Sequence, residues 1–209
     1  IAGSYTVTPA KTGYTFAPAS TAVTVSTANV SAINFTPTAV FAISGSVGTA
    51  GAGATITAGS KTATADASGN YSLTLLTAGT YIVVPSKANH VFAPANLSVT
   101  VGPNATGKNF TATAVFTISG NVGAAAATVT AGTATSLSDS SGNYTLTGVP
   151  AGSYTLTPTK TGYAFTPASR AVTVSTANLT AQNFTALGAG GAGTITNVYD
   201  AQGRLIEVR

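Results

Sequence analysis

The feature that most constrains this chain is internal repetition. The stretch 41–47 returns about 75 residues later as 116–122, and both copies contain Ile-Ser-Gly. Further shared stretches follow in the same order, and every copy closes with Asn-Phe-Thr, which begins at Asn34, Asn109 and Asn183. A fixed period of this kind is the signature of a chain built from equal structural units.

The repeat predicts how the chain is divided. Ala2-Gly-Ser-Tyr5 matches stretches that lie in the middle of the later copies, so residues 1–40 correspond to the second half of a unit only. Their expected strands are 4–9, 15–17, 21–26 and 32–36. The predicted segments are a partial module 1–40, complete modules 41–114 and 115–187, a Gly-rich linker 188–193 and a tail 194–209.

Apolar residues alternate with polar ones within each unit, which is the period of a β-strand that is buried on one side. The alternating sets are Phe41, Ile43 and Val47; Tyr71, Leu73 and Leu75; Tyr154, Leu156 and Pro158; and Val172 and Val174. No segment has a sustained helical period. We therefore predict an all-β fold of tandem antiparallel β-sandwiches, Ig-like or transthyretin-like, with about seven strands in each complete module.

These motifs resemble those of the carboxypeptidase regulatory-like family, a small transthyretin-like sandwich that occurs as tandem modules in bacterial surface proteins. The resemblance rests on Ile-Ser-Gly-x-Val, Asp-x-Ser-Gly-Asn-Tyr and Ala-Gly-(Ser/Thr)-Tyr, and it covers most of residues 1–187. It implies a sandwich fold and a role as spacer, stalk or scaffold. A fold alone does not define a function.

Composition narrows the classes of partner. Only 6% of the residues are charged, against a usual share of about 25%, so copies can pack closely without desolvating ions. The net charge of +4 comes from scattered residues, so no nucleic acid is expected. No apolar run approaches the roughly 20 residues of a membrane helix, so no membrane insertion is expected. Cysteine is absent, which excludes disulfides and thiolate metal sites.

No group of residues suggests an enzyme. His90 is the single histidine, and Tyr14 and Tyr163 stand at its position in the other copies, which favours packing over catalysis. The Asp-x-Ser-Gly-Asn stretches at Asp66 and Asp139 offer one carboxylate each, too few for a typical calcium site, and fit a hairpin turn better. We expect no catalytic residue, no cofactor, no metal and no small-molecule ligand.

Three lysines recur at one position of the repeat, Lys11, Lys87 and Lys160. An intramolecular isopeptide bond to an Asn or Asp would need a buried acid, and the only glutamate is Glu207 in the tail. Each lysine follows an expected strand and precedes an expected turn. The lysines are therefore predicted to be solvated.

The tail, 194–209, is predicted to form a β-hairpin. Its stretch 199–205 resembles one unit of the YD (Rhs-type) repeat. Long arrays of such units build shells, which one copy cannot do, so only the hairpin is expected here.

The main functional hypothesis is a structural subunit of an extracellular, cell-surface filament that polymerises with itself, head to tail. A half-sandwich exposes apolar residues and unpaired strand edges, so something must complete it. The tail of one copy would add strands to the partial module of the next copy. The expected donor residues are Ile195, Val198, Tyr199, Leu205, Ile206 and Val208, and the expected acceptor residues are Tyr5, Val7, Phe16, Val23, Val25 and Phe35.

Two other functions stay open at the level of the sequence. The chain begins without Met in the middle of a repeat, so it is either processed or part of a longer protein. In the second case it would be a stalk or spacer of a larger secreted YD-repeat or adhesin protein, with upstream strands completing the first module. A carbohydrate- or peptide-binding module would require exposed aromatic residues that gather in a cleft.

Overall fold

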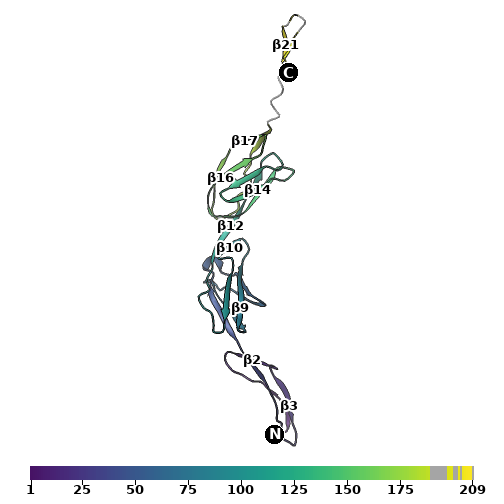
Figure 1. Cartoon of the computed structure of the whole chain (residues 1–209), viewed down its shortest axis with the longest axis vertical. Coiled ribbons are helices and arrows are strands. Elements are labelled where there is room, and N and C mark those ends of the chain that lie inside the picture. The colour runs from purple at the N-terminus through teal and green to yellow at the C-terminus, as the bar shows by residue number, and fades with distance from the viewer. Residues whose placement is uncertain (189–196, 200–201, 203, 209) are drawn as a thin grey trace. The chain divides into compact units, whose positions relative to one another are not determined.

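The computed structural model describes residues 1–188, 197–199, 202 and 204–208. Its strand pairs are antiparallel, and the one helical segment among these residues is the 3-10 turn η1, Thr49–Gly51. The predicted all-β class is therefore confirmed. None of the described residues forms a helix long and apolar enough to cross a membrane. The chain divides into two compact units, Ile1–Thr113 (purple to teal in Figure 1) and Ala114–Arg209 (teal to yellow).

The first unit begins with the partial module, which contains two separate two-stranded sheets. Its strands are β1 (Gly3–Val7), β2 (Tyr14–Ala17), β3 (Thr21–Val25) and β4 (Thr36–Ala39). β1 pairs with β3, and β2 pairs with β4. The prediction of a strand at 32–36 is wrong, because residues 29–35 are irregular and the strand begins only at Thr36.

The rest of the first unit is a complete module. Its strands are β5 (Phe41–Ser46), β6 (Thr55–Ala58), β7 (Lys61–Thr64), β8 (Asn70–Leu76), β9 (Gly79–Ser86), β10 (His90–Ala93) and β11 (Leu97–Val101). One sheet has the order β11-β9-β6-β7, and β5 pairs with β8 in another. Alternate residues of both sheets point into a common core.

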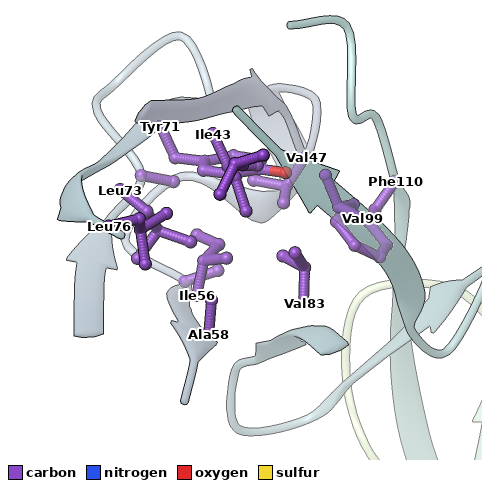
Figure 2. Close-up of a cluster of buried hydrophobic side chains, with 13 residues drawn as sticks. Ile43, Val47, Ile56, Ala58, Tyr71, Leu73, Leu76, Val83, Val99 and Phe110 are labelled. Atoms are coloured by element: carbon purple, nitrogen blue, oxygen red, sulfur yellow. The ribbon is translucent and has the colours of Figure 1, made fainter. Parts of the chain in front are cut away.

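That core is closed from all sides. Ile43 and Leu73 come from the β5–β8 pair, while Ile56 and Val83 come from the larger sheet, and all four side chains are 0% exposed. Figure 2 shows these residues gathered between the strands, with Phe110 at the margin. Burying one such side chain stabilises the fold by about 1.5–3 kcal/mol.

An irregular segment, residues 104–110, adds a further edge to the β5–β8 sheet. It runs parallel to β5, and Ala105 forms a bridge with Ile43. Four backbone hydrogen bonds join the two segments, from Ser44, Ala105, Lys108 and Phe110 as donors. The fold therefore depends on a parallel contact that joins the start of the module to its end.

A β-bulge overturns one part of the predicted alternation. Leu75 was expected on the same face as Leu73, but it is 52% exposed and Leu76 is buried instead. The register shifts between Phe41 and Ile43 on the partner strand. Leu75 takes the extra position with φ of 58°, which turns the following residue inward.

The second unit repeats this architecture. Its strands are β12 (Thr111–Asn121, which begins before the division), β13 (Thr128–Ala131), β14 (Ala134–Leu137), β15 (Asn143–Pro150), β16 (Gly152–Thr159), β17 (Tyr163–Thr166), β18 (Arg170–Val174) and β19 (Thr185–Gly188). The larger sheet has the order β14-β13-β16-β18, and β12 pairs with β15. The predicted count of seven strands is not confirmed, because β19 pairs with β17 as an eighth.

In the tail, β20 (Asn197–Tyr199) pairs antiparallel with β21 (Leu205–Val208). These strands contain Val198 and Tyr199 on one side of the turn and Leu205, Ile206 and Val208 on the other. Ile195 and most of the predicted linker, 189–193, lie outside the described residues.

Candidate functional site

The partial module has no buried core. Not one residue of 1–40 is buried, although its residues match core positions of the complete modules. Val7 is 40% exposed, whereas its counterparts Val83 and Leu156 are 0% exposed. Phe35 is half-buried, while Phe110 in the complete module is buried. The apolar face of the β1–β3 sheet therefore lies open.

This open face is a groove of about 680 Å³. Its apolar lining comprises Tyr5, Val7, Val23, Val25, Val30 and Ile33. Four of the six residues expected to accept a strand therefore line it. The other two are half-buried and lie apart from it: Phe16 is on β2 opposite Pro37, and Phe35 precedes β4.

Sequence reasoning missed Val30 and Ile33 as groove residues. A signal for Val30 existed in the repeat, because its counterparts are Ala105 and Leu179, which both pack against the module cores. Residues 29–35 form no strand, so alternation does not mark Val30 and Ile33 as parts of one face.

The first unpaired edge of the partial module belongs to β1. In the complete module, Val83–Ser86 of β9 pairs with β6, and β9 has 8 residues. β1 has only 5 residues and ends at Val7, which is the counterpart of Val83. β1 therefore ends at the position from which β9 pairs with β6 in the complete module.

The second unpaired edge is the irregular segment 29–35. In the complete module the Oδ1 atoms of Asn104 and Asn109 accept the backbone N–H groups of Ala42 and Ser46, both at 2.9 Å. The next module repeats this arrangement with other residues: Thr117 donates to Asn178 and Asn121 donates to Asn183, again at 2.9 Å.

Asn29 and Asn34 are the counterparts of these asparagines in the partial module. Among the described residues, neither side chain has a hydrogen-bond partner, and the same holds for the backbone of Val30 and Ile33. The groups that hold β5 and β12 in place are thus present in the first module without a strand to hold.

Some local contacts form in the partial module all the same. The Tyr5 hydroxyl donates to the Ile1 carbonyl at 2.9 Å. Tyr81 and Tyr154 make the same bond four residues back, at 3.0 Å. The open groove is therefore a feature of a locally ordered half-sandwich.

The recurring lysines correct a prediction. Lys87 is half-buried and donates to the Ala50 carbonyl at 2.8 Å, and Lys160 donates to the Ala125 carbonyl at 2.5 Å. These two lysines fasten the end of one strand to a loop on the other half of the module, so they are not simply solvated. Lys11 is exposed, and its Nζ lies 4.1 Å from the centre of the Tyr14 ring.

The Asp-x-Ser-Gly-Asn stretches form turns, as predicted. Asp66 accepts the N–H groups of Ser68 and Asn70 through Oδ1, and Gly69 has φ of 82°. In the matching turn, the backbone N–H of Asn143 and further N–H donors hold the pKa of Asp139 below its usual value. These carboxylates are engaged with their own loops.

His90 lies on β10, and its Nδ1 is 2.9 Å from the Ala88 carbonyl oxygen. No group of three or more His, Asp or Glu side chains gathers as a metal site among the described residues. His90 therefore has a local backbone partner at the position that tyrosine occupies in the other copies.

A second groove, of about 780 Å³, lies in the second unit beside Tyr163 and Phe165. Tyr163 is 41% exposed, but the Lys160 Nζ lies 4.5 Å from the centre of its ring. The lysine therefore covers one face of the aromatic ring that a carbohydrate would stack on.

No family model matches the sequence. No curated protein matches it either. Among solved structures, a minor pilin of the gram-positive pathogen Streptococcus agalactiae is 16% identical over 60% of this chain and 68% of its own, with a TM-score of 0.29. The Bacillus anthracis TIE protein is 13% identical over 90% of this chain and 44% of its own, with a TM-score of 0.30. A streptococcal ancillary pilin is 13% identical over 69% and 62%, with a TM-score of 0.31.

Proposed function

We propose that this chain is a non-enzymatic structural component of an extracellular, pilus-like or stalk-like assembly at the bacterial surface. The observation that carries the proposal is the open half-sandwich 1–40, which exposes at Val7 a position that the complete modules bury fully. An exposed apolar sheet face with two unpaired edges is a site for strand addition. The low share of charged residues, 6%, suits close packing between polypeptides.

Two sources of the completing strands define two forms of this assembly. In the filament form, the C-terminal tail hairpin of one copy fills the groove of the next copy, which propagates head to tail. In the stalk form, a polypeptide segment that precedes the half-sandwich completes it. The carboxypeptidase regulatory-like and YD-repeat resemblances agree with both forms.

Removal of the tail tests the filament form. The full chain and a chain that ends at Gly188 are compared by electron microscopy and light scattering. The filament form expects fibres from the full chain and none from the shortened chain. A full chain with Val23→Lys is the matched control, because it keeps the tail and places a charge in the groove. Fibres that persist without the tail contradict tail donation.

Hydrogen exchange tests the structural proposal more broadly. In an assembled sample, the amides of residues 1–40 should exchange as slowly as those of the complete modules, because the groove is filled. A sample that assembles while these amides stay unprotected would exclude the half-sandwich as the point of assembly. A chain that stays monomeric with a protected first module would contradict the acceptor role altogether.

A further inference from the structure

The complete modules show which kind of strand fits the open edge 29–35. We infer that this edge binds, in parallel, a strand with a glycine at its centre and apolar residues two positions before and two positions after it. The inference rests on the proposed function, because both require the half-sandwich to accept a strand. The inference goes further in that it specifies which residues the bound strand must have.

The glycine requirement comes from a close backbone approach. A Cβ atom added to Gly45 would overlap the carbonyl group of Lys108, and one added to Gly120 would overlap that of Gln182. The hydroxyl groups of Tyr71 and Tyr144 donate to these same carbonyls at 2.6 and 2.7 Å, so the carbonyls are held in place. Neither segment can withdraw without losing that bond.

Ile33 occupies the matching position in the partial module, two residues before Phe35. The backbone next to Ile33 keeps the conformation of its counterparts, because Ala32 has φ of 62° where Gly107 has 66°. A strand with a side chain opposite Ile33 would therefore overlap the carbonyl group of this segment, although no tyrosine of residues 1–40 holds that carbonyl. The apolar requirement comes from the neighbours of the glycine: Ile43 and Val47 flank Gly45, and both are 0% exposed. A glycine between two buried side chains lets the backbone of the strand contact the irregular segment while the flanking side chains enter the core.

The hydrogen-bonding partners of such a strand are already present. By correspondence with Ala105, Lys108 and Phe110, the donors are the backbone N–H groups of Val30, Ile33 and Phe35. The acceptors are the Oδ1 atoms of Asn29 and Asn34, which correspond to those of Asn104 and Asn109.

Among the strands that the structure describes, this type occurs as β5 and β12 only, and both are engaged in their own modules. Neither β20 nor β21 contains a glycine. The occupant is therefore a segment of the β5 type, and occupation by the tail hairpin is an outcome that the test can return.

The test is a titration of the full chain with labelled synthetic peptides. The first peptide has the sequence of residues 40–48, the second is the same peptide with Gly45→Ala, and the third has the sequence of residues 194–209. Fluorescence anisotropy gives the affinities, and NMR shows which amides become protected. We expect the first peptide to bind and the second to bind at least about tenfold more weakly. Protection should appear at Val30, Ile33 and Phe35.

An acceptor variant provides the matched control. Asn29→Ala with Asn34→Ala removes two acceptors and should weaken binding of the first peptide by about tenfold. Asn183→Ala changes the same repeat position in a complete module. There the Oδ1 atom already accepts the backbone N–H of Asn121, so this variant should leave peptide binding unchanged.

Each other outcome has a defined meaning. Equal binding of the glycine and alanine peptides would overturn the inference while leaving the acceptor role intact. Binding of the tail peptide alone would overturn it and support the filament form. Failure of all three peptides to bind would overturn both the inference and the proposed acceptor role.

Discussion

The partial module and the complete modules carry matching residues at matching positions, yet only the complete modules have a core. The β1–β3 pair joins Gly3 to Val25 at its end. β9 and β11 join Gly79 to Val101 in the same register. The local pairing is therefore identical, and burial is what differs: Val25 is half-buried, whereas Val101 is 2% exposed.

This comparison separates two levels of stabilisation. Antiparallel pairing between near neighbours and the tyrosine bond to the residue four positions back form without the other half of the module. Apolar burial, worth about 1.5–3 kcal/mol for each large side chain, requires the second sheet. The half-sandwich thus has its local pairings but lacks the apolar burial of the complete modules.

The largest expected effect is on the free energy of unfolding, when a buried side chain of a complete module is truncated. Val83→Ala should destabilise the complete module by roughly 2 kcal/mol, and Leu156→Ala the next module by roughly 3 kcal/mol, because each leaves a cavity. Val7→Ala should cost less than about 0.5 kcal/mol, because that residue is 40% exposed and its removal leaves no closed cavity. Native-state hydrogen exchange measures the modules separately. An equal cost at Val7 and Val83 would mean that the groove is filled in solution.

The next largest effect on stability concerns the glycine of β12, which the parallel segment approaches closely. Gly120→Ala should cost about 1–3 kcal/mol, since the new methyl group overlaps the Gln182 backbone. Gly3→Ala is the control, because its Cβ would meet the Tyr5 ring at an ordinary 3.6 Å. Urea unfolding followed by hydrogen exchange gives both values. A harmless Gly120→Ala would break the steric argument for a glycine-centred strand.

Alkaline pH should affect the complete modules selectively. Burial raises the pKa of Tyr71 and of Tyr144 from 10.0 to about 12. The unfolded chain therefore releases these protons at a lower pH than the folded modules do. Stability should be fully present below about pH 10 and decline as pH rises towards 12.

Thermal unfolding across this pH range checks the expectation. Tyr71→Phe and Tyr144→Phe should reduce the slope, each in its own module. The half-sandwich has no counterpart of these tyrosines, so protection within 1–40 should not follow this slope. A slope unchanged in both variants would assign the alkaline sensitivity to other groups.

The smallest expected effect is a stabilisation. Leu75 adopts φ of 58°, and its counterpart in the next module is Gly148 with φ of 69°. Leu75→Gly should stabilise the module by about 1 kcal/mol, because a β-carbon is costly in the left-handed region. Gly148→Ala should destabilise the other module by a similar amount. Differential scanning calorimetry detects both, and a loss of stability in Leu75→Gly would show that the exposed leucine packs in solution.

Much of this architecture was predictable from local patterns. Turn residues such as Asp66 and Gly69 interact only with residues a few positions away in the sequence, so their hairpin could be predicted. Alternation located the inward residues of β16 and β18 correctly, from Leu156 to Val174. It failed at Leu75, because a bulge is defined by the partner strand and not by the sequence that contains it.

The candidate groove was predictable only in part. Tyr5 and Val7 stand out by alternation. Val30 lies in an irregular segment without alternation, so only its repeat counterparts Ala105 and Leu179 indicate its role. The lysines were misjudged for a related reason. Lys87 meets the Ala50 carbonyl, 37 positions away, and no local pattern encodes that distance.

Periodicity and self-comparison were sufficient to predict the strand-rich fold class, the repeated unit and the match of residues 1–40 to the second half of that unit. Only the folded structure shows that the end of each complete module lies parallel to its first strand. The need for glycine at position 45 arises in the same way, because the backbone that excludes a Cβ there belongs to Lys108, 63 positions away. Contacts between segments so distant in the chain exist only after both sheets have assembled.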